Sequence, residues 1–261
     1  MRDDSPRRRP PAALRSTAPR STALCSVAAL ALTACGPVIG EDRAERTAPA
    51  GPFAGLSGPE IAERSVQATK EASSLTLDVD FTTEDGPLKA YMATGKDGKC
   101  AGTLSVGSTG TAELIKIGGA AYLRFDEAFL REELKGEPAA EAQATLKLLK
   151  GRWVRTDASD EEAAEELELC DLDRLLGDIE TNDTEARRGR QTTVDGRKAL
   201  MLTETDGDAT YTMYVATEGK PYLLRIDQKG GDDPGTITFS DFDKPVVAKK
   251  PADKDIFELP E

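Results

Sequence analysis

The four cysteines are the residues of this 261-residue chain whose types and spacing best support a specific chemistry. They lie at positions 25, 35, 100 and 170. The chain contains no histidine, so it lacks the commonest metal ligand and the usual general base near neutral pH. Histidine-based catalytic triads and zinc sites are therefore disfavoured, and acylation and disulfide formation are the reactions to consider.

Cys35 stands at the end of an N-terminal segment built like an export signal. Residues 2–20 are rich in arginine, and residues 23–31 form an apolar run too short to span a bilayer. Leu32-Thr33-Ala34-Cys35 resembles a bacterial lipobox, in which the cysteine is lipid-modified and becomes the mature N-terminus. We therefore expect residues 1–34 to be a lipoprotein signal peptide and Cys35 to carry the lipid. A cysteine buried in an ordinary helix is the alternative, and Arg7-Arg8-Arg9 leaves the choice between Sec and Tat export open.

Cys100 and Cys170 remain as an even pair once Cys25 is removed with the signal and Cys35 is acylated. In an oxidising compartment such a pair is expected to form a disulfide. The bridge would close a loop of about 70 residues and stabilise the fold by about 4 kcal/mol. Two separate buried thiols are the alternative.

The charge of the chain is strongly negative, at −13 overall. Removing residues 1–34 takes away six arginines and two aspartates and leaves 28 basic and 45 acidic residues, a net charge of −17. Such a chain repels phosphate backbones, which excludes nucleic acid as a favoured partner. Membrane attachment is then expected through the lipid.

An acidic run between the predicted strands admits two interpretations. Oxygen clusters can bind calcium, but the run has no EF-hand spacing, so a solvated helix face is favoured and no metal site is predicted. Its members are Asp157, Asp160, Glu161, Glu162, Glu165, Glu166 and Glu168.

Enzyme signatures are missing from the sequence. It has neither a G-x-S-x-G nucleophile motif nor a phosphate-binding glycine loop. Asp78 and Asp80 are expected on the polar face of a strand, where carboxylates serve solubility. We therefore predict a non-enzymatic protein without a cofactor.

Three regions are expected along the chain. Residues 35–56 are rich in Gly, Pro and Ala and are interpreted as a lipidated N-terminus followed by a flexible tether. Residues 57–261 are interpreted as one folded domain, which begins with a capping box, Ser57-x-x-Glu60, and a helix from residue 59.

Hydrophobic periodicity predicts an α+β domain. Alternation with period two indicates strands over 75–83, 88–95 and 100–107, two strands within 112–125, and further strands between 185 and 242. Helical spacing is expected over 126–149 and 160–178, and 151–156 is either a short strand or an extended link. About ten such strands predict a large curved antiparallel sheet with helices covering its concave face.

The apolar residues of these strands are candidates for the lining of a cavity beneath the helices. Such a set of residues ordinarily forms a closed core, and the more specific alternative is that it lines a cavity for acyl chains. Small residues at positions 90, 102, 112 and 121 fit either interpretation. The candidate lining residues are Leu77, Val79, Phe81, Met92, Leu104, Val106, Leu123, Leu200, Leu202, Met213, Val215, Leu224, Ile226 and Phe239.

Five segments carry a family resemblance through their order and spacing: "GGAAYLRFDEAF", "LKGRWVRT", "TTVDGRKALML", "YVATEGKPYLLRI" and "TFSDFDKPV". Together they are similar to actinobacterial lipoproteins of the LppX/LprAFG type, over roughly residues 60–258. The resemblance implies a LolA-like half-barrel anchored outside the cytoplasmic membrane. Some members of that family carry acylated lipids or glycolipids in an apolar cavity.

The expected function is that of an extracytoplasmic lipoprotein, anchored in the cell membrane, which binds a hydrophobic ligand, most simply a lipid, as a carrier or chaperone. The alternative is an envelope interaction or sensor lipoprotein with a filled core and a protein partner.

Overall fold

The computed structural model describes residues 51–84, 86–160, 167, 170–177 and 185–258, all within one compact unit, Arg46–Glu261. The expected signal peptide, Cys35 and the tether up to residue 50 lie outside the described residues. So do Glu161, Glu162, Glu165, Glu166 and Glu168 of the acidic run.

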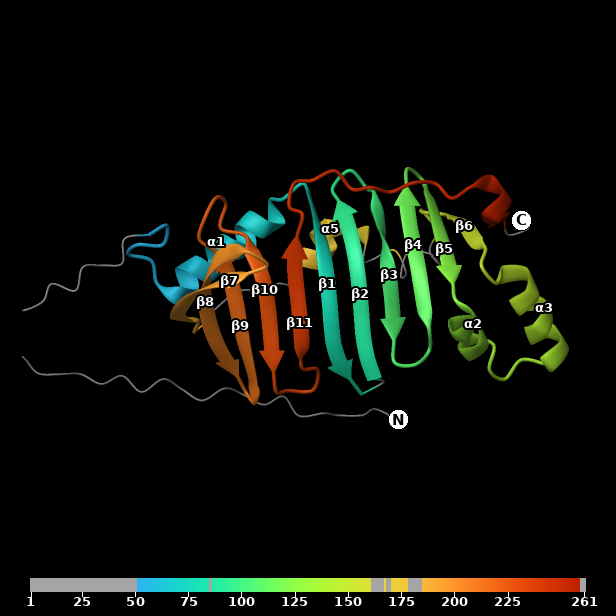
Figure 1. The fold of residues 1–261 in the computed structure, drawn as a ribbon, viewed down its shortest axis with the longest axis horizontal. Coiled ribbons are helices and arrows are strands. Elements are labelled where there is room, and N and C mark those ends of the chain that lie inside the picture. Colours follow the sequence, from blue (N-terminus) through green and yellow to red (C-terminus); the bar gives the residue numbers. More distant parts are fainter. Residues whose placement is uncertain (1–50, 85, 161–166, 168–169, 178–184, 259–261) are drawn as a thin grey trace, which may run out of the picture. The chain divides into compact units, whose positions relative to one another are not determined.

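Within the described residues, twelve strands form one sheet in the order β12-β6-β5-β4-β3-β2-β1-β11-β10-β9-β8-β7 (Figure 1). β12 pairs with β6 in parallel, and the other neighbours are antiparallel. The N-terminal strands are β1 (Ser74–Thr83), β2 (Gly86–Gly95), β3 (Cys100–Val106), β4 (Thr111–Ile117), β5 (Ala120–Phe125) and β6 (Trp153–Asp157). The C-terminal strands are β7 (Arg187–Val194), β8 (Arg197–Asp206), β9 (Ala209–Ala216), β10 (Leu223–Lys229), β11 (Gly235–Ser240) and β12 (Ile256–Glu258).

Tight turns with glycine at positive φ connect most of these strands. In the β7–β8 hairpin, Asp195 and Gly196 have φ values of 47° and 79°, the left-handed pair that a two-residue hairpin turn requires. The predicted α+β class with a large antiparallel sheet is confirmed, and residues 153–157 are a strand. β12 lies beyond the last predicted strand, and the sequence analysis missed it.

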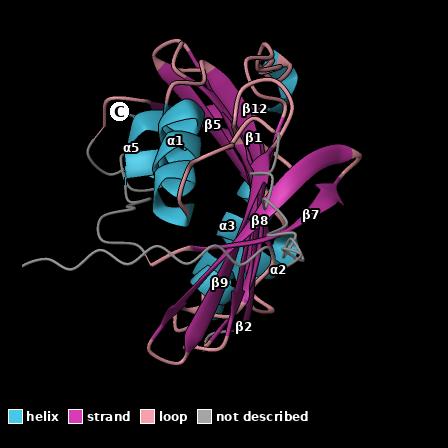
Figure 2. Cartoon of the chain, turned by 90° about the vertical axis from the view of Figure 1, so that its left-hand side faces the viewer, coloured by secondary structure: helices cyan, strands magenta, loops and turns pink. Residues whose placement is uncertain are grey.

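Two helices cover one face of the sheet, which we call the helix-covered face; the opposite side is the outer face. Figure 2 views the sheet from its β7 end and shows α1 (Gly58–Lys70) and α5 (Leu172–Gly177) together on one side. The predicted capping box is present at the start of α1. The Glu60 amide donates to the Ser57 side chain, and the Ser57 amide donates to the Glu60 carboxylate. Ile61 and Ala62 of α1 are fully buried, because they pack against the apolar side chains of the sheet.

The other two described helices contribute less to the cover than the sequence predicted. α2 (Glu127–Glu133) reaches the helix-covered face only at one corner, where Phe129 stacks on Phe125 of β5 with ring centroids 4.8 Å apart. α3 (Ala139–Leu149) has no buried residue, and Figure 1 shows it beyond β6. The expectation that the helices over 126–149 roof the sheet is therefore wrong for α3. No helix in the described ranges is long and apolar enough to cross a membrane.

The N-terminal boundary of the domain lies earlier than the predicted residue 57. Phe53, assigned to the tether, is only 5% exposed and packs in the main core cluster. Arg188 of β7 donates from Nη1 to the carbonyl oxygens of Phe53 and Leu56, at 2.9 and 2.7 Å. The Gly- and Pro-rich composition suggested a tether, but one large apolar side chain fixes these last residues to the sheet.

The C-terminal segment crosses the sheet after β11, along the upper ends of the strands in Figure 1, and reaches a 3-10 helix, η2 (Asp253–Asp255), and β12 at the far edge. Asp243 fastens the start of this segment. Its carboxylate accepts hydrogen bonds from the Ser73 amide at 2.9 Å, the Tyr222 hydroxyl at 2.5 Å and the Lys220 ammonium at 2.9 Å. These partners hold the pKa of Asp243 well below its ordinary value of 3.8, the Tyr222 hydroxyl most strongly.

Candidate functional site: the apolar face of the sheet

Thirteen of the fourteen candidate lining residues lie on the helix-covered face. The register shows this directly, since Leu77 pairs with both Phe239 and Met92, and directly opposed residues of antiparallel strands share a face. The set continues outward in both directions along the sheet. Its members are Leu77, Val79, Phe81, Met92, Leu104, Val106, Leu123, Leu200, Leu202, Met213, Val215, Ile226 and Phe239.

Leu224 is the exception, and its placement corrects the sequence analysis. A β-bulge between Leu223 and Arg225 shifts the alternation, so Leu223 pairs with Val215 and joins the main core cluster. Leu224 packs instead with Tyr222 and Val194 in a separate cluster. Simple alternation from Tyr222 therefore selected the wrong leucine, because a bulge places two residues of one strand opposite one of its partner.

Helix α1 is fixed over this bulge by buried hydroxyl groups. The amide of Leu223 donates to Thr69 Oγ1 at 3.0 Å, and the Thr69 hydroxyl donates to the Ser65 carbonyl at 2.8 Å. Thr69 and Ser65 are at most 1% exposed. The bonds satisfy polar groups that would otherwise be buried unpaired at the centre of the apolar face.

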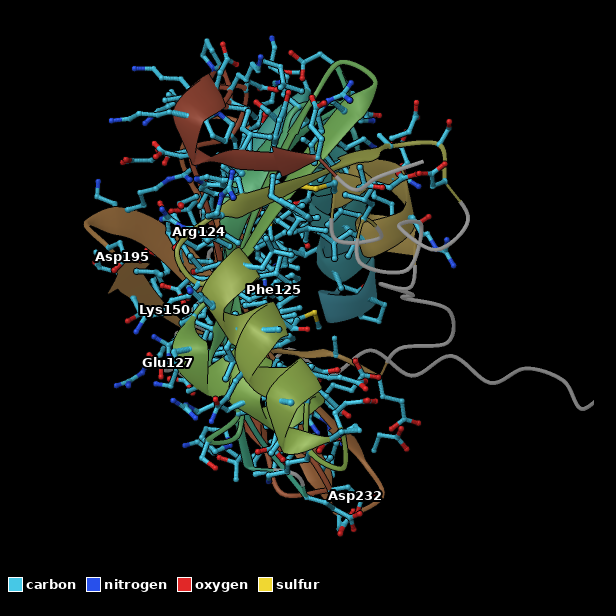
Figure 3. The ribbon with its side chains drawn as sticks, turned by 90° about the vertical axis from the view of Figure 1, so that its right-hand side faces the viewer. Arg124, Phe125, Glu127, Lys150, Asp195 and Asp232 are labelled. Atoms are coloured by element: carbon cyan, nitrogen blue, oxygen red, sulfur yellow. A yellow bond between two sulfur atoms is a disulfide. The ribbon has the colours of Figure 1, made fainter. Side chains whose placement is uncertain are left out.

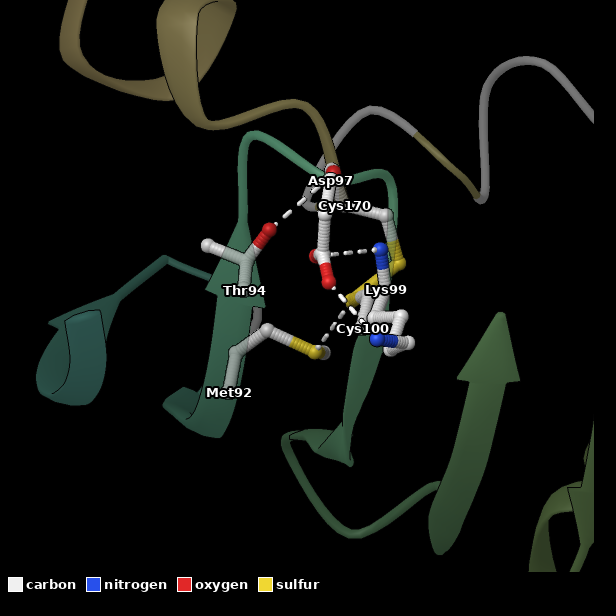
Figure 4. The surroundings of a disulfide bond; sticks show 6 residues. All are labelled: Met92, Thr94, Asp97, Lys99, Cys100 and Cys170. Atoms are coloured by element: carbon white, nitrogen blue, oxygen red, sulfur yellow. Dashed lines mark hydrogen bonds and ion pairs between the residues drawn. A yellow bond between two sulfur atoms is a disulfide. The ribbon is translucent and has the colours of Figure 1, made fainter. Parts of the chain in front are cut away.

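Helix α5 is fixed to the sheet by the predicted disulfide, Cys100–Cys170, with a Cα–Cα distance of 5.3 Å (Figure 4). The fully buried hydroxyl of Thr94 donates to the Cys170 carbonyl at 3.0 Å, and Met92 Sδ lies 3.2 Å from Cys100 Sγ. Leu167 packs with these residues over β4 and β5. The bridge thus ties the chain before α5 to β3.

The two covering helices are also joined to each other. Lys70 at the end of α1 donates to the Gly177 carbonyl at the end of α5, at 3.3 Å. Lys96 of the β2–β3 turn donates to the Lys70 carbonyl at 2.7 Å and forms an ion pair with Asp173 of α5 at 3.0 Å. Because the helices share these partners, they form a single fixed cover.

The cover extends over only part of the apolar face. Along β1, Leu75 and Leu77 are 1% and 5% exposed beneath the helices, whereas Val79 and Phe81, further along the same strand and on the same face, are half-buried. The same change runs across neighbouring strands. We call the resulting set the half-exposed apolar row; it consists of Val79, Phe81, Leu104, Val106, Leu123, Ile226 and Ile237.

One of the small residues in the sheet does not create space. A Cβ atom built on Gly102 would lie 2.1 Å from the Tyr91 carbonyl oxygen and 2.7 Å from Met92 Sδ. The volume next to Gly102 is therefore filled by its neighbours, which is the tight-packing interpretation of this residue. Ala90 and Ala112 lie beside the half-exposed apolar row and are themselves half-buried.

At the far end of the row, the surroundings are aromatic and charged. Figure 3 looks at this end and shows Phe125 beside α2, with Glu127 and Lys150 close to each other. Glu127 forms ion pairs with both Lys150 and Arg131, and these cations lower the pKa of its carboxyl. The Lys150 ion pair holds α2 against the segment after α3, next to the stacked Phe125 and Phe129 rings, whereas the Arg131 ion pair lies within α2.

The outer face carries a separate groove of about 570 Å³. Tyr91, which is 53% exposed, and Trp153 line it together with residues 244–247 of the C-terminal segment. It contains none of the candidate lining residues; its lining is mostly apolar, and Thr103, Glu113 and Lys244 add polar groups. We therefore place the candidate site on the helix-covered face, where the apolar surface is continuous with the core.

Asp80 and Asp157, two of the carboxylates considered in the sequence analysis, bond to neighbouring side chains of the fold. Asp80 forms an exposed ion pair with Lys89 on the outer face. Asp157 accepts bonds from the amide and hydroxyl of Ser159, which lower the pKa of its carboxyl. Among the residues with described positions, no group of three or more Cys, Asp or Glu side chains is placed to hold a metal ion.

Comparisons with known proteins identify the fold. No family model and no curated protein matches the chain. Among solved structures, LprF from Mycobacterium bovis aligns with a TM-score of 0.50 and 15% identity over 75% of this chain and 97% of its own. Mycobacterium tuberculosis lipoprotein LppX aligns with a TM-score of 0.46 and 14% identity over 73% of this chain and 97% of its own. The chain therefore has the fold of LprF, which agrees with the fold that the resemblance of its sequence segments predicted.

Proposed function

We propose that the protein is an exported lipoprotein that binds the acyl chains of a lipid along the half-exposed apolar row and carries them at the extracytoplasmic face of the cell membrane. In this proposal residues 1–34 are the removed signal peptide and Cys35 carries the membrane anchor. The ligand is held without covalent chemistry, cofactor or metal.

The observation that supports this function is the continuity of the apolar face. The row begins where the buried core under α1 and α5 ends, and it extends across strands from β10 to β5 without a charged side chain among its seven members. Contiguous apolar surface that a fold leaves half-exposed commonly marks an interaction site. An extended hydrocarbon chain could lie across the strands in contact with the whole row.

The energetics suit a reversible carrier. Each methylene group that leaves water contributes about 0.8 kcal/mol, so about ten buried methylenes supply about 8 kcal/mol, close to micromolar affinity. The covering helices are fixed by the disulfide and the Thr69 and Lys96 contacts. We therefore propose that the ligand enters at the half-exposed side of the face, beyond the fixed cover.

Mass spectrometry under native conditions tests the proposal. The mature protein is released from the envelope of its own host in mild detergent, and its bound lipids are extracted and identified. A lipid present in stoichiometric amount, together with saturable uptake of a fluorescent fatty acid, supports the carrier. Bare polypeptide with no uptake would contradict it and favour an interaction module with a filled core.

A further inference from the structure

We propose that strand β7 at the edge of the sheet docks on the anionic lipid headgroups of the membrane that anchors the chain. This inference rests on the proposed anchor at Cys35. It concerns orientation: the lipid provides attachment, and β7 determines which part of the domain faces the bilayer.

The charge of β7 is opposite to that of the chain as a whole. Its eight residues include Arg187, Arg188 and Arg190 and no acidic residue, in a chain with a net charge of −13. All three arginines are exposed, and β7 is the last strand of the sheet, so its outer edge has no neighbouring strand in the described fold. Within the described residues, none of the three forms an ion pair with a carboxylate.

The chain that leads to the anchor begins beside the same strand. Arg188 holds the carbonyl groups of Phe53 and Leu56, and Figure 1 shows this N-terminal segment next to α1 and β7. From Cys35 to Gly51 the chain advances 16 positions, which span at most about 55 Å even when fully extended. β7 and β12 are the two opposite edges of the sheet, and twelve strands span about 50 Å, so β12 lies about 50 Å from the edge where the tether begins. The anchor therefore favours the β7 edge as the part nearest the bilayer.

Charge complementarity favours the same orientation. Anionic headgroups repel the acidic body of the domain, whereas each basic residue close to such a surface strengthens association about fivefold. Arginine suits phosphate groups, because its planar guanidinium can donate two parallel bonds to them. Arg197, just after the β7–β8 turn, adds to the basic side, whereas Lys198 is already paired with Glu218 at 2.7 Å. Asp195 in that turn and Glu185 before β7 oppose the basic charge.

Arginines on an exposed edge strand have another known role, which is to prevent pairing with other chains. That role requires no approach to a membrane. The two interpretations therefore differ in where β7 lies when the anchored protein is on a bilayer.

The test uses the mature, acylated full chain in vesicles of phosphatidylcholine with or without phosphatidylglycerol, both containing a lipid with a quencher on its headgroup. A fluorophore is attached at Gln191→Cys on β7 or at Lys254→Cys at the far edge. We expect quenching at position 191 to be several times that at position 254 with phosphatidylglycerol. Quenching at position 191 should fall severalfold without the anionic lipid or in high salt, where the Debye length shrinks to about 3 Å. Only the smaller difference between the two positions that the tether alone produces should remain.

Charge reversal supplies the matched controls. Arg187→Glu with Arg190→Glu should remove the extra quenching at position 191, whereas Lys147→Glu with Lys249→Glu, an equal change in charge at exposed positions elsewhere, should preserve it. Equal quenching of both labels in chains that float with the vesicles would overturn the docking and leave the anchor intact. Chains that fail to float would overturn the anchor and the docking together, while the fatty-acid uptake assay reports on ligand binding independently.

Discussion

Thr69 of α1 accepts a hydrogen bond from the amide of Leu223, at the β-bulge of β10, with an N–O distance of 3.0 Å. The bond connects the helical cover to a place where the C-terminal half of the apolar face breaks its regular alternation. Both residues are at most 1% exposed, so water cannot replace either partner.

Replacing Thr69 with valine should therefore destabilise the domain by about 1–3 kcal/mol, since the substitution keeps the shape of the side chain and leaves a buried amide unsatisfied. Urea unfolding followed by circular dichroism measures the change. Thr69→Ser retains the hydroxyl and should lose clearly less stability. Equal losses for the two variants would show that packing, and not the hydrogen bond, holds α1 in place.

Reduction of the Cys100–Cys170 bridge should lower the free energy of unfolding by about 4 kcal/mol, because the bridge closes a loop with a sequence separation of 70. Urea unfolding with and without reductant measures this difference. A double Cys100→Ala, Cys170→Ala variant should match the reduced protein and show no response to reductant. An unchanged midpoint on reduction of the parent protein would contradict a stabilising role.

The Asp243 carboxylate gives a pH prediction whose sign follows from its lowered pKa. A group with a lowered folded-state pKa stabilises the fold above its unfolded pKa, here about 4, and the contribution is lost as pH falls from there towards the lowered value. Asp243→Asn should thus be less stable than the parent at pH 7, with a gap that narrows below pH 4. Thermal unfolding across this range measures the gap. Asp232→Asn, at an exposed loop position, is the control and should show no such pattern.

Ligand binding can be tested on a single strand. Leu104 lies in the half-exposed apolar row, and its neighbour Thr103 is exposed on the outer face. Leu104→Asp should weaken fatty-acid uptake at least tenfold, because a charged group would lie against the hydrocarbon chain. Thr103→Asp adds the same charge and should leave uptake unchanged. Similar uptake by both variants would place the ligand elsewhere.

Membrane attachment depends on one side chain in the proposal. Cys35→Ala removes the acceptor of the lipid and should release the protein from the membrane fraction of the host. Fractionation followed by immunoblotting measures the distribution. The Cys25→Ala variant, changed within the proposed signal peptide, is the control and should remain with membranes. Sedimentation of Cys35→Ala with membranes would contradict the anchor.

Much of the fold follows from local sequence pattern. Alternation over Leu75, Leu77, Val79 and Phe81 predicts both the strand and its apolar face, because each strand residue points to the side opposite its neighbour. The disulfide is predicted from the number of cysteines that remain after export, and the structure contains it.

The missed features depend on contacts that are distant in sequence. The bulge that selects Leu223 over Leu224 is stabilised by Thr69, 154 positions away, and alternation within β10 carries no sign of it. Phe53 is buried because its ring packs in the main core cluster and Arg188 donates a hydrogen bond to its carbonyl oxygen. The residues around Phe53 nevertheless have the composition of a linker. β12 is only three residues long, and it is a strand only because it pairs with β6.

The pairing of β1 with β11 also affects how the chain folds. Apart from the pairing of β6 with β12, strands β2–β6 and β7–β11 pair with close neighbours in sequence. Thr76 of β1, in contrast, pairs with Ser240 of β11, 164 positions later. Pairing two strands so distant in sequence costs more chain entropy than forming a hairpin, so this pairing forms slowly. Strand β1 lacks its β11 partner until the residues that follow it, 164 positions along the chain, are available for pairing. The half-formed sheet therefore passes through a stage in which the edge of β1 is exposed to aggregation.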